Sequence, residues 1–320
     1  MKKNKIKDTG LEITELSFGT SSLGSMPDTY GYEVSEDRAQ KTLNRFFQGP
    51  VNMLDTSRNY AMGESEKRIG RAIKENGGWP KDFLLSTKLD RNMDTLVLDK
   101  NRARESLEES LKTLNVDSVD ILFLHDPEYT KDITDITKKD GAMDELFKIK
   151  EEGLAKAVGV AMGKVDIMFP LLKDWDFDVI INHNRYTLIN REANEMYDYA
   201  SSKNIAIFNA APYAGGVLAK GPDNFKKVTY QDATEEKLAP AREFEKVCKK
   251  HNVELGAAAL QFSLRDNRIT STICGVTSVE SIEKNLAWAN AEISGEFWDE
   301  VLKLPFSSND PESDRVFTAG

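Results

Sequence analysis

The sequence has few of the features that mark disulfide-rich, membrane-spanning or secreted proteins. It has only two cysteines, Cys248 and Cys274, and neither lies in a CxxC pair, so we expect free thiols in a reducing cytoplasm rather than a disulfide framework. No run approaches the roughly 18 apolar residues that a membrane span needs. A signal peptide has an apolar segment after its basic residues, and the N-terminal MKKNKIKDTG has no such segment after its lysines. These absences predict a cytoplasmic protein without a membrane segment.

Positive charge is also scarce. The chain has 43 Lys and Arg against 53 Asp and Glu, which gives a net charge of 43 − 53 = −10. An acidic surface repels a phosphate backbone, so we expect no nucleic-acid partner.

What the sequence does contain is an alternation of short apolar runs with longer amphipathic stretches. RARESLEESLKTLNV, for example, places Leu107, Leu111 and Leu114 on one stripe of a helix. Near-continuous apolar strands separated by helices indicate a parallel sheet covered by helices. We expect strands at 15–20, 51–55, 83–88, 119–125, 155–161, 178–182, 205–211 and 270–276, and helices near 36–48, 63–76, 99–114, 141–152, 164–173, 191–203, 235–251 and 278–289.

Eight strands, each followed by a helix, fit an α/β fold of the (β/α)8 or TIM barrel type. A doubly wound open sheet is the alternative, but FGTSSLGSMP after the first strand is not the GxGxxG fingerprint that such a fold predicts. KIKDTGLEITEL is expected to form an N-terminal β-hairpin that plugs the base of the barrel. Residues 294–304 are expected to add a C-terminal helix, and the last sixteen residues to be extended. No Pro- or Ser-rich linker divides the chain, so we interpret residues 1–320 as one domain.

Ionisable side chains gather at the ends of three consecutive predicted strands. NMLDTSRNYAMGESEKRIG places Asp55 at the end of one strand and Tyr60 in the loop after it. The next two strands end at Lys88 in LSTKLD and at His125 in ILFLHDPE. Taken one at a time, these are most simply a cap, a loop aromatic, a solvated lysine and a packed histidine. Together they fall where the catalytic residues of a barrel lie, which favours a site.

The four side chains have the chemistry of proton transfer. A tyrosine hydroxyl, with a pKa of about 10, is a poor acid at neutral pH unless a cation lies beside it. Lys88 supplies the cation, Asp55 holds it charged and oriented, and His125 offers a second donor or a proton route. The set would polarise a carbonyl or, in reverse, deprotonate an alcohol. It contains no electron carrier, so a hydride donor must come from a cofactor.

LDTSRNYAMGESEKRIGRAI resembles the DTAxxYGxGxSExxLG signature of the aldo-keto reductase family, with Asp55, Tyr60, Gly63, Ser65, Glu66 and Gly70 in place. Within the family the chain is similar to the aldose 1-dehydrogenase branch (D-threo-aldose or L-fucose, and L-galactose dehydrogenase-like), through EEGLAKAVGVA, NRYTLIN and NAAPYAGGVLAKG. The resemblance implies that Tyr60 is the general acid/base, that Lys88 and Asp55 tune it, and that His125 orients the substrate carbonyl.

The resemblance also implies a dinucleotide site in the C-terminal half. The backbone of PYAGGVL (212–218) would cradle the pyrophosphate, and GVTSVESIEKN (275–285) would present helix N-terminal amides to the adenosine end. At the nicotinamide, Ala161 and Met162 replace the usual Ser-Asn pair, and Ala210 replaces the usual stacking aromatic. The expected cofactor-binding residues are Gly19, Thr20, Asn182, His183, Tyr213, Gly215, Gly216, Leu218, Gly275, Thr277, Ser278, Glu280 and Asn285.

The same region bears on the choice between NAD and NADP. A 2′-phosphate needs a cationic clamp, whereas a 2′-hydroxyl is satisfied by Glu or Ser. Thr277 and Ser281 occupy the positions where members that prefer NADP put basic residues, and Glu280 is acidic. Only Lys284 is basic there, so NAD is favoured over NADP.

The loops at the mouth of the barrel would set the substrate. Segments 21–33, 90–95 and 126–130 mix aromatics with acids and hydroxyls, as a sugar pocket would, although ordinary loop surface is the other interpretation. The side chains of interest in these loops and beside Tyr60 are Tyr30, Tyr32, Tyr129, Arg58 and Asn59. Arg185, close after a buried strand, is either a substrate ligand or the partner of a core carboxylate.

The sequence therefore predicts an NAD(P)-dependent oxidoreductase that moves hydride between a nicotinamide and a sugar or small carbonyl substrate. The alternatives are an NADPH-dependent aldehyde or ketone reductase, and a non-catalytic redox sensor of the same fold. A metal-dependent hydrolase is disfavoured because His125, His183 and His251 are not clustered, and no metal site is expected. A retaining glycosidase is disfavoured because strand 4 ends in His125, although Asp126 and Glu128 follow.

Overall fold

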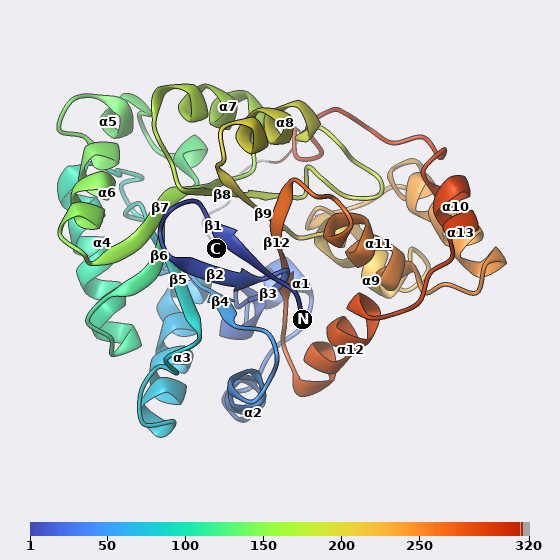
Figure 1. Cartoon of the computed structure of the whole chain (residues 1–320), viewed down its shortest axis with the longest axis horizontal. Helices are drawn as coiled ribbons and strands as arrows, with labels where there is room; N and C mark the ends of the chain where they lie inside the picture. The colour runs from blue at the N-terminus through green and yellow to red at the C-terminus, as the bar shows by residue number, and fades with distance from the viewer. Residues whose placement is uncertain (314, 316–320) are drawn as a thin grey trace.

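The computed structural model describes residues 1–313 and residue 315. Eight parallel strands close into a barrel in the order β12-β3-β4-β5-β6-β7-β8-β9, which confirms the predicted fold (Figure 1). The strands are β1 Lys3–Ile6, β2 Leu11–Thr14, β3 Leu16–Gly19, β4 Met53–Asp55, β5 Leu84–Leu89, β6 Val119–His125, β7 Ala155–Met162, β8 Val179–His183, β9 Ala206–Ala210, β10 Lys227–Val228, β11 Gln231–Asp232 and β12 Ile269–Gly275.

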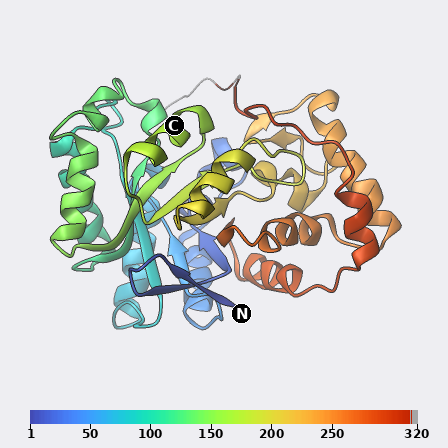
Figure 2. The ribbon, with the colours of Figure 1, turned by 45° about the horizontal axis from the view of Figure 1, so that its top comes forward.

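Helices surround the barrel on its outer face, and the segments that connect the strands carry several short turns (Figure 2). The longer helices are α2 Glu36–Phe47, α3 Glu64–Glu75, α4 Lys100–Leu114, α6 Ala142–Glu151, α7 Val165–Asp174, α8 Asn194–Ser202, α10 Glu235–Lys250, α11 Leu255–Leu264, α12 Val279–Ala289 and α13 Gly295–Val301. The short ones are η1 Ser22–Gly24, α1 Pro27–Tyr30, η2 Tyr60–Gly63, η3 Pro127–Tyr129, α5 Thr134–Thr137, η4 Ala214–Gly216 and α9 Val217–Lys220.

The eight predicted strands and eight predicted helices are confirmed, with ends displaced by a few residues. The sequence did not predict α11, which follows α10 closely. Every residue of α11 from Leu255 to Ser263 is buried, so LGAAALQFSL has no polar face and shows no helical period. A helix that is apolar all round cannot be recognised from amphipathicity.

The N-terminal hairpin lies across the end of the barrel where the strands begin (Figure 1). Ile6, Leu11 and Ile13 are buried in one apolar cluster with inward-facing strand residues such as Phe123 and Phe208. The predicted plug at the base is therefore confirmed. It leaves the opposite end, where the strands finish, for polar side chains.

Two glycines show how closely the layers pack. A Cβ on Gly70 of α3 would lie 2.0 Å from the Thr113 carbonyl oxygen of α4, and a Cβ on Gly159 of β7 would lie 1.7 Å from the Val179 carbonyl oxygen of β8. No side chain fits at either distance, so both positions require glycine for close approach. For Gly70, this explains a glycine of the family signature by packing.

The predicted C-terminal helix is confirmed as α13, which ends earlier than expected at Val301. The segment after it runs from the side of the molecule back toward its middle (Figure 2). Ser307 pairs with Asn190 in an isolated parallel bridge, and residues 311–313 form a turn, so the predicted extended segment is not extended throughout. The end of the predicted extended segment, residues 314 and 316–320, lies outside the described residues. Within the described ranges, no helix is long and apolar enough to cross a membrane.

Candidate active site

Lys88 and Asp55 form a buried ion pair at the open end of the barrel. β4 ends at Asp55, and Lys88 lies one residue before the end of the neighbouring β5. Lys88 Nζ donates hydrogen bonds to Asp55 Oδ2 at 2.8 Å and to the Thr56 carbonyl oxygen at 2.6 Å. Ser86 Oγ donates to the other oxygen of the carboxylate at 2.9 Å. The two charges are therefore compensated and fixed in orientation, although both side chains are almost fully buried.

Tyr60 lies against this pair. It begins η2, where Ala61 and Met62 adopt positive φ angles of 51° and 54° and turn the chain sharply after β4. Lys88 Nζ lies 4.6 Å from the centroid of the Tyr60 ring, and the His125 ring contacts it edge-on with centroids 5.7 Å apart. The structure thus brings together all four residues that the sequence singled out.

The proton affinity of Tyr60 differs from the expectation. The sequence suggested that Lys88 would make the tyrosine a better acid. Burial, and then the negative charges of Asp55 and Asp126, instead hold the pKa of Tyr60 well above its ordinary value. Lys88 gives its hydrogen bonds to Asp55 and Thr56, and its cation lies over the Tyr60 ring.

His125 is oriented by Asp90, a residue the sequence interpretation missed. His125 Nδ1 and Asp90 Oδ1 are 2.5 Å apart. Asp90 is fully buried, and its other oxygen accepts hydrogen bonds from Ser57 Oγ at 2.6 Å and from the Asn59 amide at 3.0 Å. Asp90 was assigned only to a substrate loop, 90–95. Its place two residues after Lys88 in LSTKLD was the available signal, because alternate residues of an extended chain share a face.

The carboxylates around His125 set its charge. Burial alone would lower the pKa of His125, but Asp126 and Asp90 outweigh it and raise that pKa above its ordinary value. Burial would likewise raise the pKa of Asp90, but His125 and Ser57 hold it below its ordinary range. A protonated imidazole with its Nδ1–H on Asp90 presents its Nε2–H to the mouth of the barrel.

Of the two roles left open for Arg185, the structure shows the carboxylate pairing. Its guanidinium, 1% exposed, binds Asp310 Oδ1 at 2.6 Å and also Glu312 of the C-terminal segment. Glu312 in turn binds Arg315. These ion pairs tie residues 310–312 to the loop that follows β8.

Arg58 and Asn59, which flank Tyr60, have different partners. Arg58 Nε binds Glu109 of α4 at 3.1 Å, so its charge is directed to the outer helix. The Asn59 amide joins the Asp90 network.

The loop aromatics meet at the mouth. Tyr30 shares a hydrogen bond with Ser21 at 2.7 Å and packs edge-on against Tyr230 with ring centroids 5.7 Å apart. Tyr32 is 6.3 Å from Tyr30, centroid to centroid, and Arg91 lies 5.6 Å from the centroid of the Tyr129 ring. Tyr230 was not predicted, because it reaches the mouth only through its contact with Tyr30, which lies 200 residues earlier in the sequence.

The nicotinamide region fits a dinucleotide in one specific respect. Asn182, fully buried at the end of β8, donates from Nδ2 to the carbonyl oxygens of Met162 at 3.1 Å and Gly163 at 2.8 Å. Its Oδ1 is buried without a hydrogen-bond partner. An orphaned acceptor of this kind suits a carboxamide NH2 group, such as that of nicotinamide.

The pyrophosphate region fits as well. Gly215 and Gly216 have φ angles of 75° and 122°, and a Cβ on Gly215 would lie 2.7 Å from the Tyr230 amide nitrogen. This backbone takes a form that only glycine adopts readily, as expected of a phosphate cradle. Leu218, by contrast, lies in the hydrophobic core, and its amide is bonded to the Tyr213 carbonyl oxygen.

The residues predicted to bind the adenosine part of the cofactor form hydrogen bonds with one another. Ser278 caps α12, and the amides of Thr277 and Ser278 both donate to Ser281 Oγ at 3.0 Å. Asn285 accepts from the Tyr213 hydroxyl at 2.5 Å and donates to the Ser281 carbonyl oxygen at 2.7 Å. The Oδ1 and Nδ2 atoms of Asn285 each keep capacity for one further hydrogen bond.

The remaining predicted residues lie at strand ends around the same mouth. Gly19 and Gly275 are paired at the ends of β3 and β12. The Thr20 hydroxyl donates to the Asp55 carbonyl oxygen at 2.9 Å. His183 ends β8, with Nδ1 3.6 Å from Glu312. Glu280 is exposed in the first turn of α12.

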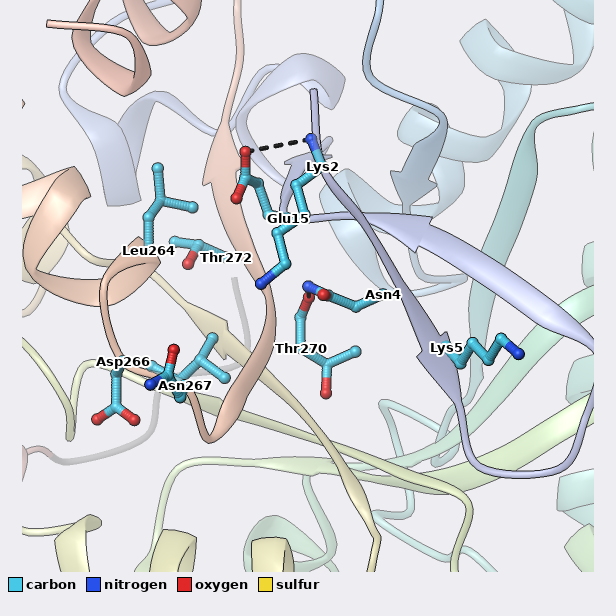
Figure 3. A pocket seen from close by; sticks show the side chains of 10 residues that line it. Lys2, Asn4, Lys5, Glu15, Leu264, Asp266, Asn267, Thr270 and Thr272 are labelled. Carbon is cyan, nitrogen blue, oxygen red and sulfur yellow. Dashed lines mark hydrogen bonds between the residues drawn. The ribbon is translucent and has the colours of Figure 1, made fainter.

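A separate small cavity lies at the other end of the barrel. It has a volume of about 140 Å³ and is lined by the hairpin and the start of β12, including Lys2, Asn4, Glu15 and Thr270 (Figure 3). Asn4 Nδ2 donates to the Thr270 carbonyl oxygen at 2.7 Å, which ties the hairpin to the barrel. Because the plugged core separates this cavity from the four residues above, we assign it no part in the chemistry.

Residues 15–304 match the model of the Aldo/keto reductase family. The chain belongs to this family. It is 31% identical to the L-galactose dehydrogenase of Arabidopsis thaliana over 284 residues, which cover 88% of this chain and 85% of that protein. It is 28% identical to the D-threo-aldose 1-dehydrogenase of a Pseudomonas species over 321 residues, covering 92% and 94%.

The fold agrees with solved structures of the family. An aldo-keto reductase from Bacillus halodurans in its holo form superposes with a TM-score of 0.79 and 21% identity, over 99% of this chain and 100% of that one. The family membership makes this protein an NAD(P)-dependent oxidoreductase acting on carbonyl or alcohol groups.

Proposed function

We propose that this aldo-keto reductase is an aldose 1-dehydrogenase-like enzyme that moves hydride between a nicotinamide and the anomeric carbon of a sugar. The observation that carries the proposal is the Lys88 ammonium, which Asp55 holds at 2.8 Å and which lies 4.6 Å from the Tyr60 ring centroid, beside His125. The two curated relatives named above, both sugar dehydrogenases, support the substrate class.

In this proposal Tyr60 is the general acid/base. In the oxidative direction its phenolate takes the proton from the substrate hydroxyl, and Lys88 stabilises that phenolate electrostatically. Asp55 keeps Lys88 charged and in place. His125 donates from Nε2 to the same substrate oxygen and so fixes its position. The cofactor, when bound, supplies the hydride acceptor that the side chains lack.

We further propose NAD rather than NADP as the preferred cofactor. Glu280 is acidic at the start of α12, and Lys284, the single basic residue of the segment 275–285, lies 4.6 Å from the centroid of the Trp288 ring. A 2′-hydroxyl suits such a site better than a 2′-phosphate. The test is the ratio of kcat/KM with the two cofactors, and a strong preference for NADP would contradict the proposal.

The function is tested with a panel of aldoses and aldehydes, each with NAD or NADP, followed by absorbance of the reduced nicotinamide. We expect oxidation of aldoses by the wild-type protein. Tyr60→Phe should lower kcat by roughly 10²- to 10⁴-fold, the usual contribution of a general acid/base. Tyr199→Phe is the matched control, since Tyr199 lies on the outer helix α8 and contacts Phe169 and Lys203.

The outcomes separate the alternatives. Undiminished turnover in Tyr60→Phe would remove Tyr60 from the central role. Turnover of simple aldehydes with NADPH and none of aldoses would favour a general carbonyl reductase. Cofactor binding without turnover of any compound would favour a redox sensor.

A further inference from the structure

Asp126 follows His125 directly and is held rigidly. Its backbone is left-handed, with φ 44° and ψ 53°, a conformation that aspartate tolerates better than most residues. Its amide donates to the Ala161 carbonyl oxygen at 2.9 Å, and its carbonyl oxygen accepts from the Tyr129 amide at 3.1 Å. Since the backbone is fixed on both sides, the Cα–Cβ bond has a fixed direction, and in this structure the carboxylate lies beside His125.

The Asp126 carboxylate has spare hydrogen-bonding capacity. Its side chain is 21% exposed, and its nearest recorded partner is His125 Nε2, 3.7 Å from Oδ2. Within the described residues, no donor forms a hydrogen bond to this carboxylate. Asp90, on the other side of the same imidazole, receives three such contacts. Asp90 is therefore a structural partner of His125, whereas Asp126 faces the mouth with its acceptors free.

The other acids at the mouth are turned away from His125 or bound by arginines. Glu128 Oε1 accepts a hydrogen bond at 2.9 Å from the Gly163 amide, just before α7, and its Oε2 is buried without a partner. The two oxygens of Glu312 are bound by Arg185 and Arg315. Among these acids, Asp126 is the one whose partly exposed carboxylate lies beside Nε2 of His125.

The distance of 3.7 Å between His125 Nε2 and Asp126 Oδ2 is too long for a hydrogen bond but suits two adjacent ligand oxygens. One oxygen bound to Nε2 and a second bound to Oδ2, each at about 2.8 Å, would span the gap if they lay side by side. The oxygens on neighbouring carbons of a 2-hydroxy aldehyde, or of a sugar at C1 and C2, are spaced in this way. A carboxylate only accepts hydrogen bonds, so the second group must be a hydroxyl and not a carbonyl.

We propose that Asp126 is a specificity-determining residue that accepts a hydrogen bond from the hydroxyl next to the reacting carbon. It selects 2-hydroxy aldehydes and aldoses over aldehydes without that hydroxyl, and it disfavours 2-oxo aldehydes by repulsion. The inference rests on the proposed function, because that function places the reacting oxygen on Nε2 of His125.

Three aldehydes of the same carbon skeleton test the inference: lactaldehyde with a 2-hydroxyl, propanal with no group there, and methylglyoxal with a 2-oxo group. The wild-type protein should reduce lactaldehyde with a kcat/KM about 10- to 100-fold above that of propanal, the range for a hydrogen bond to a charged group. In Asp126→Ala this ratio should fall toward one, beyond any loss that all three aldehydes share because Asp126 also raises the pKa of His125. Asp126→Asn keeps the shape and adds a donor, so it should raise methylglyoxal relative to lactaldehyde. Asp174→Asn, at the exposed end of α7, is the matched control and should change no ratio.

The ratio separates a specificity role from a positioning role. An equal loss on all three aldehydes in Asp126→Ala would mean that the residue acts through His125, and it would overturn the inference. An unchanged ratio would overturn it too.

A wild-type protein that turns over no aldehyde or sugar would contradict the proposed function instead. Calorimetric titration of galactose and 2-deoxygalactose into the wild-type and Asp126→Ala proteins with NAD then decides. Tighter binding of galactose by the wild-type protein alone would support the role of Asp126, and any other pattern would overturn it.

Discussion

The Nζ atom of Lys88 lies 4.6 Å from the centroid of the Tyr60 ring. The hydrogen bonds of the ammonium go to Asp55 and to the Thr56 carbonyl oxygen, so the cation acts on the tyrosine through space rather than through a hydrogen bond. A positive charge there stabilises a phenolate more than a phenol. Lys88 thus supplies the positive charge that stabilises the Tyr60 phenolate, and its ion pair with Asp55 keeps the buried ammonium protonated.

Removing the cation should separate its catalytic role from its structural one. Lys88→Met leaves the Asp55 carboxylate buried without its cation, so we expect a loss of about 3–5 kcal/mol in the free energy of unfolding together with a loss of activity. The double variant Asp55→Asn, Lys88→Met removes both charges and should recover most of the stability but none of the activity. Urea unfolding and kcat measurements on the same preparations check this. Activity in the stable double variant would contradict the role of Lys88.

Oxidation should become faster as the pH rises. Burial and the nearby carboxylates of Asp55 and Asp126 raise the pKa of Tyr60 well above its ordinary value, so the phenol dominates at neutral pH. Only the phenolate accepts a proton, and its fraction grows tenfold for each pH unit below that pKa. We expect log kcat for alcohol oxidation to rise with pH between about 7 and 9, while carbonyl reduction, which uses the phenol, stays nearly constant. A pH-independent oxidation rate limited by chemistry would be inconsistent with Tyr60 as the base.

Asp90→Asn should alter the pH range of reduction. The variant removes one of the two carboxylates that raise the pKa of His125, so the imidazolium should be lost at a lower pH than in the wild-type protein. We expect kcat/KM for reduction to fall about 10-fold or more at pH 8, and by less at pH 6. A uniform loss across the pH range would indicate that Asp90 only holds the ring in place. The measurement is the pH profile of kcat/KM, with Asp117→Asn, at an exposed position after α4, as control.

The sequence was a good guide to the fold because each barrel strand is a short, nearly continuous apolar run. Residues at the ends of those runs were easy to recognise, so Asp55, Lys88 and His125 were found. What was missed depends on contacts between distant segments. Asp90 gains its role only by facing His125, 35 residues away. The apolar helix α11 lacks a polar face, and its place became clear only in the assembled structure.

Local sequence also does not predict how burial changes the pKa of a side chain. The presence of Lys88 suggested a more acidic Tyr60, whereas desolvation and Asp55 dominate and raise its pKa. Arg185 was noticed as unusual in the sequence, but its partners Asp310 and Glu312 lie more than 120 residues away.

The C-terminal segment should detach when Arg185 is replaced. Arg185 binds both Asp310 and Glu312, and its planar guanidinium presents five donors in a rigid fork, which a single ammonium group does not. We expect Arg185→Met to speed hydrogen–deuterium exchange across residues 305–313, where the Ser307 amide is bonded to the Ile189 carbonyl oxygen. Arg185→Lys should give an intermediate rate. Exchange rates equal to those of the wild-type protein in both variants would show that the ion pairs do not hold the segment.

Glu66 should make the protein less stable above neutral pH. It is fully buried, accepts a hydrogen bond from Thr87 Oγ1 at 2.6 Å through Oε1, and has no partner for Oε2. Burial is the main reason that its pKa rises to about 7. The folded state therefore holds this proton more tightly than the unfolded state does. The contribution of Glu66 to stability is full below the unfolded pKa and is lost as the pH rises through about 7.

Glu66→Gln tests this sign directly. The amide keeps the acceptor for Thr87 and places a donor near Ser110, so the variant should unfold with a free energy about 1–3 kcal/mol higher than the wild-type protein at pH 8, and nearly equal to it at pH 5. Glu108→Gln, at an exposed position on α4, should leave the two proteins equal at both pH values. Urea titrations at the two pH values give the difference. A variant less stable at pH 8 than the wild-type protein would show that the ionised carboxylate is stabilising, so that Glu66 would belong with the charged network of the barrel rather than with its apolar packing.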